Sequence, residues 1–235
     1  MKIFILTWII ILQSSFIIAC DDQNTQSDLG TSLDLISYGL TCCPLKNHKI
    51  REPDAVAREG GGFYANRGSN SCHFAIDLET FSATGESGEG KRVFASGAGT
   101  VVLAIKNWGK AGHTVIIDHG QNVYSLYAHL QVISVNYKEQ VQAGESVGTV
   151  GYSGNAEQLR AKGLPAHLHF MIIKTLEPLS NWKPLSIVRE IEKIDDIIPH
   201  MDNFGFIDST SWLGSTCPNE DCGIPSTPTG VDIGP

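Results

Sequence analysis

The 235-residue sequence predicts an all-β protein, mainly an antiparallel β-sheet assembly, with a short C-terminal helix and an irregular tail. Its strand-like runs are short, rich in Val and Ile, and separated by turns that contain glycine. No long helical pattern lies between them, which argues against parallel βαβ units. The expected strands are residues 74–78, 92–95, 99–105, 114–118, 123–130, 146–150 and 167–173.

The N-terminus has the pattern of an export signal. Lys2 is followed by an apolar run over residues 3–12, and Ala19 precedes Cys20. A small residue directly before cysteine resembles the cleavage site of bacterial lipoproteins, which implies that residues 1–19 are removed and that Cys20 carries a lipid. The alternatives are an ordinary signal peptide and an uncleaved anchor. We therefore expect an exported, membrane-anchored lipoprotein of the bacterial cell envelope, facing the periplasm or the cell surface.

The rest of the chain divides into three parts. Residues 20–50 begin with a polar run and are interpreted as a linker and an N-terminal arm. Residues 51–185 hold the β-rich pattern and form the expected main domain, and residues 186–235 form a C-terminal extension. The short helix is expected in this extension, where isoleucines recur on one helical face: Ile187, Ile191, Ile194 and Ile198.

Charge and cysteine content restrict the partners and the compartment. Against 25 Asp and Glu there are 17 Lys and Arg, a net charge of −8, and no basic run interleaves with aromatics, so we expect no nucleic-acid partner. An exported chain sits where disulfides persist. We expect Cys72 to pair with Cys42 or Cys43, which is favoured over a metal role for Cys72. Cys217 and Cys222 can close a small loop.

Two short motifs carry the candidate chemistry: His73-Phe-Ala-Ile-Asp77 and His167-Leu-His169. Each places its polar residues an even number of positions apart, which puts them on one face of a strand, and the residues between are apolar. Imidazole and carboxylate are preferred ligands of Zn²⁺, and a hydrolytic site keeps one position for water. His73, Asp77 and either histidine of the second motif can supply three ligands. The alternative is a set of cleft histidines without a metal.

A further histidine lies in the strand expected over 123–130. Strand alternation predicts that Tyr127 and His129 share one face, with Leu126, Ala128 and Leu130 on the other. On the metal face, His129 can donate a hydrogen bond to the oxyanion that forms when a peptide carbonyl is attacked. His119 is expected in a turn or cleft wall, and His48 and His200 are expected to be solvated.

From about Gly61 to Ile173 the sequence resembles the lysostaphin-type (LytM-like) zinc endopeptidases that cut peptidoglycan. Roughly half of the chain carries the resemblance, and it includes both motifs above. The matching segments are His73-Phe-Ala-Ile-Asp77, Val93-Phe-Ala-Ser-Gly-Ala-Gly-Thr-Val101, Val115-Ile-Ile-Asp-His119-Gly120, Tyr127-Ala-His129-Leu130, Val141-Gln-Ala-Gly-Glu-Ser-Val-Gly-Thr-Val-Gly-Tyr-Ser-Gly154 and His167-Leu-His-Phe170.

The resemblance implies a role for each residue. His73, Asp77 and His169 become the zinc ligands, His167 the general base and His129 the oxyanion stabiliser. The implied activity is zinc-dependent hydrolysis of peptide bonds in the stem or cross-bridge peptides of peptidoglycan, by a zinc metallopeptidase domain over residues 51–185. Other wall hydrolases are then possible partners.

The sequence also departs from the family pattern. Ala75 stands where the family usually has glycine, His113 stands where asparagine is common, and residues 155–166 form a longer loop than usual before His167. Tyr64 lies where the family often has a tyrosine, although packing is its favoured role. These departures keep two rivals open: a non-catalytic module of the same fold that regulates other wall hydrolases, and a zinc-carrying lipoprotein.

Overall fold

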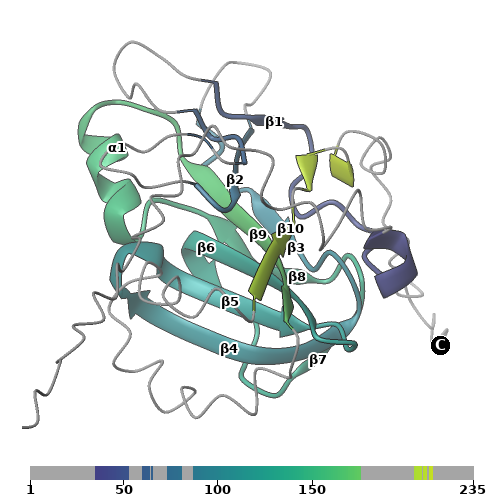
Figure 1. Ribbon diagram of the computed structural model, residues 1–235. Helices are drawn as coiled ribbons and strands as arrows, with labels where there is room; N and C mark the ends of the chain where they lie inside the picture. Colours follow the sequence, from purple (N-terminus) through teal and green to yellow (C-terminus); the bar gives the residue numbers. More distant parts are fainter. Residues whose placement is uncertain are drawn as a thin grey trace, which may run out of the picture.

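The computed structural model describes residues 35–52, 60–63, 65, 73–80, 87–175, 204–207, 209–210 and 212–213 (Figure 1). Several predictions fall outside these residues. They concern the signal peptide with Cys20, Tyr64, Cys72, the helix expected over 187–198, His200, and the pair Cys217 and Cys222. No helix among the described residues is long and apolar enough to span a membrane.

The described chain is dominated by antiparallel strands, which confirms the predicted fold class. The main sheet runs in the order β1-β2-β9-β6-β5-β4-β7, while β10 pairs with β9, and β8 joins β3 to β6. The strands are β1 (His48–Ile50), β2 (Ile76–Thr80), β3 (Arg92–Phe94), β4 (Gly99–Trp108), β5 (Gly112–Asp118), β6 (Val123–Ile133), β7 (Gln140–Val141), β8 (Ser146–Val150), β9 (His167–Thr175) and β10 (Phe204–Ile207).

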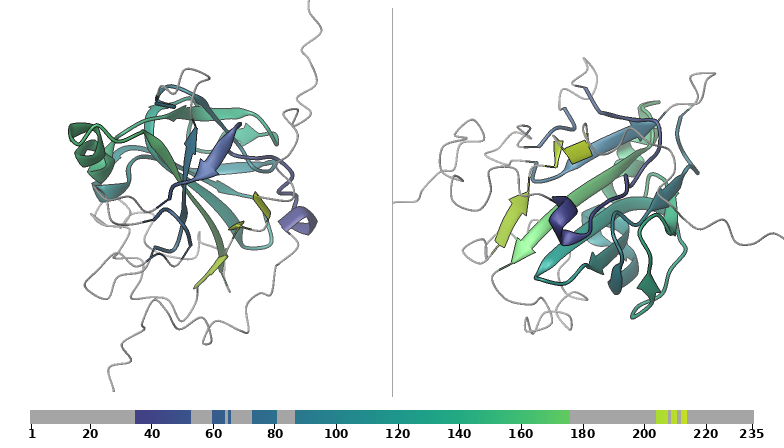
Figure 2. Two further views of the ribbon diagram at one scale, coloured as in Figure 1. Left: turned by 90° about the horizontal axis from the view of Figure 1, so that it is seen from above. Right: turned by 90° about the vertical axis from the view of Figure 1, so that its right-hand side faces the viewer.

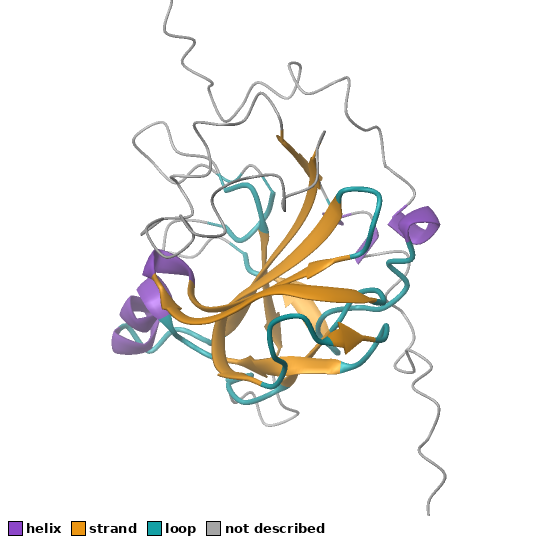
Figure 3. Ribbon diagram, turned by 90° about the horizontal axis from the view of Figure 1, so that it is seen from below, coloured by secondary structure: helices purple, strands orange, loops and turns teal. Residues whose placement is uncertain are grey.

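All seven predicted strands are present, with shifts of a few residues at their ends. The sequence analysis did not predict β1, β7 and β10, of which β1 and β7 are only three and two residues long. It also did not predict helix α1 (Glu157–Ala161), which lies with the 3-10 turn η3 (Gly154–Ala156) in the long loop before β9. The other 3-10 turns are η1 (Leu35–Tyr38) and η2 (Gly109–Ala111). In Figures 2 and 3, α1 and η1 lie at opposite sides of the twisted sheet.

The two faces of the sheet carry different residues. Along β9, Leu168, Phe170 and Ile172 enter a large apolar cluster, while Met171 and Ile173 enter a second cluster on the other face. The two histidines of β9, His167 and His169, have the parity of this second face. The sheet therefore separates a large core from a smaller apolar surface with imidazoles at its end.

The N-terminal arm belongs to the large core. Leu35, Leu40 and Leu45 are buried there, and the Trp212 indole N–H donates to the Leu40 carbonyl at 3.2 Å. Cys43 takes part in a disulfide, as expected for one of the two arm cysteines. The arm therefore packs as part of the fold and continues into β1.

One prediction about β6 is wrong. Tyr127 and Leu130 pack in the same cluster, although simple alternation places them on opposite faces, and Leu126 and Ala128 pack in the other. The cause is a β-bulge: the β5–β6 register shifts by one residue at Ala128 and His129, and His129 has a positive φ of 60°. The bulge turns His129 away from the Tyr127 face and toward the imidazoles of β9.

Candidate metal centre

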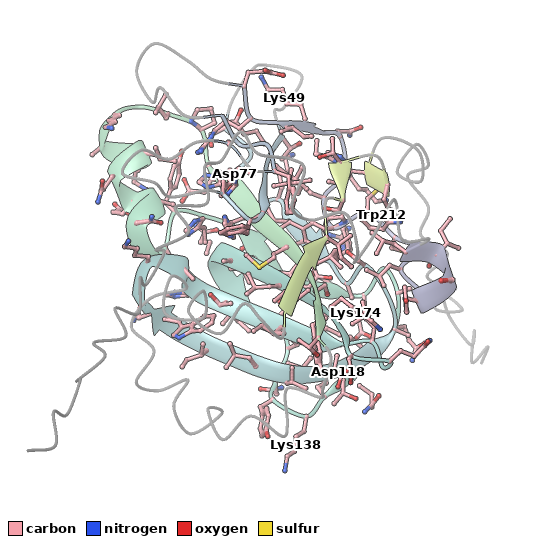
Figure 4. The ribbon with its side chains drawn as sticks, viewed as in Figure 1. Lys49, Asp77, Asp118, Lys138, Lys174 and Trp212 are labelled. Atoms are coloured by element: carbon pink, nitrogen blue, oxygen red, sulfur yellow. The ribbon has the colours of Figure 1, made fainter. Side chains whose placement is uncertain are left out.

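The centre forms where β2 meets β9. The two strands are antiparallel, and their register places Asp77 directly opposite His169. Directly opposed side chains on one face lie within contact distance. His73 lies three residues before β2, where its backbone N–H donates to the Ala65 carbonyl at 3.0 Å. The two sequence motifs are therefore adjacent in space, beside β2 and β9 (Figure 4).

Three donor atoms converge at this point. His73 Nε2 lies 3.2 Å from Asp77 Oδ1, His169 Nδ1 lies 3.0 Å from the same oxygen, and the two nitrogens are 3.2 Å apart. Ligand atoms around a tetrahedral Zn²⁺ with bonds of about 2.0–2.1 Å are about 3.3 Å apart. The donor set and the spacing of His73, Asp77 and His169 therefore fit a zinc ion.

The tautomer of His73 is fixed by its surroundings. Its Nδ1 lies 3.1 Å from the Gly62 carbonyl oxygen, which can only accept a hydrogen bond. Nδ1 must therefore carry the proton, and the lone pair of Nε2 faces Asp77 and His169. Such a second contact commonly orients a histidine that binds a metal.

Asp77 is the charged member of the centre. It is 2% exposed, and burial alone would raise its pKa; the adjacent His73 and His167 outweigh burial and hold the pKa of Asp77 well below its usual value. Its Oδ2 accepts an ion pair from Arg51 Nη2 at 2.7 Å. The carboxylate is thus ionised at neutral pH, as a metal ligand must be.

Two more histidines flank the three donors. His167 Nε2 lies 3.7 Å from Asp77 Oδ1, and the His129 ring lies 4.9 Å from the His167 ring and 5.5 Å from the His169 ring. His129 Nδ1 lies 2.9 Å from the Ser153 carbonyl, so Nδ1 carries the proton and Nε2 is an acceptor. Within the described part of the chain, the buried Nδ1 of His167 has no hydrogen-bond partner.

Burial makes both flanking histidines weak bases. It lowers the pKa of His129 to about 3, helped by repulsion from protonated His169. Burial also lowers the pKa of His167 well below its usual value, against the attraction of Asp77. Both rings are therefore neutral at pH 7 in the metal-free chain, which is the form that can accept a proton.

The structure brings all five predicted site residues together, and it adds two that the sequence analysis missed. Arg51 carried no signal because it precedes Asp77 by 26 positions and belongs to no motif. Ser153 stands in a quoted family segment, but its carbonyl contact with His129 depends on the folded loop. The methyl group of Ala75 is buried in the second apolar cluster, on the same side as the donors.

The other histidines have different surroundings. His119 Nδ1 lies 2.9 Å from the Ala98 carbonyl and its Nε2 lies 2.7 Å from Ser125 Oγ, so it is bound into the sheet. His48 is half-buried with Nδ1 2.6 Å from the Leu45 carbonyl, which corrects the expectation of a solvated ring. His113 is half-buried, and its backbone N–H donates to Ser153 Oγ at 2.8 Å.

The long loop before β9 is held by polar contacts. Arg160 pairs with Glu89, and its guanidinium lies 4.6 Å from the centre of the Tyr152 ring. The Tyr152 hydroxyl donates to the Leu164 carbonyl at 2.8 Å, and the Ala166 N–H donates to Ser87 Oγ at 3.0 Å. Because His167 follows directly, these contacts fix the loop beside the centre.

An antiparallel sheet that presents a His/Asp/His donor set and two free-standing histidines has the architecture of a metallopeptidase. Residues 75–181 match the model of peptidase family M23. Lipoprotein NlpD of Yersinia enterocolitica is 33% identical over 79 residues, which cover 32% of this chain and 81% of that protein. The chain belongs to peptidase family M23, which confirms the resemblance seen in the sequence.

Longer relatives match over part of their length. Peptidoglycan DD-endopeptidase ShyA of Vibrio cholerae is 34% identical over 94 residues, 40% of this chain and 20% of ShyA. Murein hydrolase activator NlpD of Escherichia coli is 30% identical over 99 residues, 37% of this chain and 26% of that protein. The chain thus spans about a quarter or less of these two relatives. Lysostaphin of Staphylococcus simulans aligns in structure at 21% identity with a TM-score of 0.41, over 67% of this chain and 51% of lysostaphin.

Proposed function

We propose that the chain is a zinc-dependent endopeptidase that hydrolyses peptide bonds in the stem or cross-bridge peptides of peptidoglycan. One observation carries the proposal: His73 Nε2, Asp77 Oδ1 and His169 Nδ1 converge within 3.2 Å of one another, with two neutral histidines beside them. A structural zinc site needs no such free histidines. The name of the relative ShyA, a peptidoglycan DD-endopeptidase, supports the substrate class.

The chain's residues divide the work. His73, Asp77 and His169 would hold the zinc ion, which when bound lowers the pKa of a water molecule to about 7. His167, buried with an unpartnered Nδ1 among the described residues, is placed to take a proton and pass it to the leaving amine. The buried sheet face around these side chains keeps bulk water away from them.

His129 acts in two stages. Its Nδ1 proton is engaged with the Ser153 carbonyl, so neutral His129 offers only an acceptor at Nε2. It can donate to an oxyanion only after Nε2 gains a proton. The His167 ring, 4.9 Å away, is the neighbouring group with which it shares that proton. We therefore expect the two histidines to act as a pair, with protonated His129 supporting the oxyanion.

Digestion of purified cell-wall sacculi tests the proposal. The zinc-loaded chain should release soluble peptides, a chelator should stop the release, and added zinc should restore it. Mass spectrometry of the fragments identifies the bond. The matched control is His119→Gln, which alters a histidine outside the centre and should retain activity. Sacculi that stay intact with every divalent metal tried would contradict the proposal.

A second candidate is a regulatory module that acts on other wall hydrolases. The observation in its favour is the relative named murein hydrolase activator NlpD, at 30% identity. It predicts that His169→Ala, which breaks the donor set, still stimulates a partner hydrolase on sacculi. The proposed peptidase predicts that the same variant is inert alone.

We further propose that the chain is exported and anchored to the membrane through a lipid on Cys20. The match to lipoprotein NlpD of Yersinia enterocolitica supports a cell-envelope location. Globomycin, which blocks lipoprotein signal peptidase, should cause the uncleaved form to accumulate, and Cys20→Ala should release the chain from membranes. Unchanged processing in both cases would contradict the anchor.

A further inference from the structure

Arg51 contacts the candidate metal centre from outside the segment that matches the family, residues 75–181. It follows β1 directly, and it is 8% exposed, which is rare for an arginine unless its charge is paired. Its Nη2 lies 2.7 Å from Asp77 Oδ2. The N-terminal arm therefore contributes a charged group to a centre whose other members come from β2, β6 and β9.

The backbone holds Arg51 firmly against Asp77. The Arg51 N–H donates to the Asp77 carbonyl at 2.9 Å, the Gly61 N–H donates to the Arg51 carbonyl at 2.7 Å, and the Asp77 N–H donates to the Gly61 carbonyl at 2.7 Å. A Cβ atom at Gly61 would lie 2.7 Å from the Cβ of Asp77 and 2.8 Å from that of Arg51. Only glycine fits between them, so the three segments are closely spaced.

The two oxygens of Asp77 face different partners. Oδ1 faces His73 at 3.2 Å and His169 at 3.0 Å, whereas Oδ2 faces the guanidinium of Arg51. A carboxylate whose second oxygen is held in this way can offer only the first to a metal. Without that contact the group can rotate, or bind an ion through both oxygens.

We propose that Arg51 is a positioning residue of the metal centre, which fixes Asp77 as a one-oxygen ligand with Oδ1 toward the histidines. This inference rests on the proposed zinc site. It extends the centre beyond the family segment, so that the arm packed in the core also completes the site. Outer contacts of this kind typically account for a 10–100-fold difference in metal affinity.

The competing view is that Arg51 and Asp77 form an ion pair that only stabilises the arm. Stability and metal binding must therefore be measured separately. We choose Arg51→Gln, which removes the charge, and Arg51→Lys, which keeps the charge but loses the planar two-pronged donor. The matched control is Lys49→Gln, two residues earlier on β1, whose ammonium lies 3.9 Å from Glu79 on a side chain that is 55% exposed.

Three measurements separate the two views: zinc affinity by competition with a chromophoric chelator, the visible spectrum of the Co²⁺-substituted chain, and thermal unfolding in EDTA. For Arg51→Gln we expect zinc binding weakened about 10–100-fold and a weaker Co²⁺ spectrum, because Asp77 becomes free to bind through both oxygens. For Arg51→Lys we expect a loss of about 3–10-fold. Lys49→Gln should match the wild type.

Each result decides the question. An Arg51→Gln chain that folds and binds zinc within about threefold of the wild type, with an unchanged Co²⁺ spectrum, overturns the role of Arg51 while leaving the zinc site intact. If Arg51→Gln does not fold, the same criterion applied to Arg51→Lys decides. A wild-type chain that binds no zinc overturns the proposed function together with this inference.

Discussion

Two histidine clusters lie on opposite faces of β6, and they differ in how their polar atoms are satisfied. In the first, His119 bonds to the Ala98 carbonyl and to Ser125, and Ser125 donates to the Tyr127 hydroxyl at 2.8 Å. In the second, His73, His169 and His167 all face one carboxylate oxygen of Asp77. Figure 4 shows Asp77 and Asp118, the neighbour of His119, near opposite ends of the sheet.

The difference lies in whether protein groups complete the cluster. His119 meets a carbonyl and a hydroxyl, each at hydrogen-bond distance, so its contacts need no ion. The Asp77 cluster instead gathers several acceptor atoms around one point, and such an arrangement is costly in a buried site unless a cation fills it. Similar residues thus form a hydrogen-bonded network on one face and a metal centre on the other, and the predictions below test that contrast.

The largest effect is expected from His169→Ala. This change removes one of three converging donors and should weaken zinc binding by at least about a hundredfold, with loss of peptide release from sacculi. Competition with a chelator measures the first, and digestion measures the second. His119→Ala, in the other cluster, should bind zinc like the wild type. Stoichiometric zinc in His169→Ala would contradict the ligand assignment.

The next effect is on catalysis alone. His129→Gln keeps all three donors and should keep zinc, but it loses the group that stabilises the oxyanion. We expect kcat to fall about 10²–10³-fold, the usual effect of removing such a donor. Zinc affinity within about threefold of the wild type is the control. A variant that loses zinc and activity together would place His129 among the ligands.

A pH effect should appear in the metal-free chain. The pKa of His129 is lowered to about 3 by burial, whereas the unfolded residue titrates near 6.5. The unfolded state therefore binds more protons below pH 6.5, so the free energy of unfolding falls as pH falls through this range. Asp77 adds to this only below about pH 4, because its folded pKa is lowered as well.

For His129 alone the loss between pH 7.5 and 5.5 is about 1.4 kcal/mol at most. Urea unfolding in EDTA at the two pH values measures it. His129→Gln should lose less stability over this interval than the wild type, because the substituted residue does not titrate. An equal loss in both chains would show that His129 is solvated in the metal-free state.

The sequence predicted the parts of the centre that follow from regular alternation. Asp77 and His169 sit on paired strands with a period of two, so their shared face could be read directly. The face of His129 could not, because a bulge with a positive φ breaks the alternation at that residue. Arg51 could not be found either, because its contact joins distant segments through a strand of three residues.

The smallest effect is expected in the hydrogen-bonded cluster. The Tyr127 hydroxyl is fully buried and accepts the Ser96 N–H at 2.8 Å as well as the Ser125 hydroxyl. Tyr127→Phe leaves that buried N–H without this acceptor, which should lower the free energy of unfolding by about 1–3 kcal/mol. Urea unfolding measures the change, and zinc affinity should stay within about threefold of the wild type. A loss of zinc binding would mean that the two faces of β6 are coupled, because nothing in the Tyr127 cluster touches the three donors.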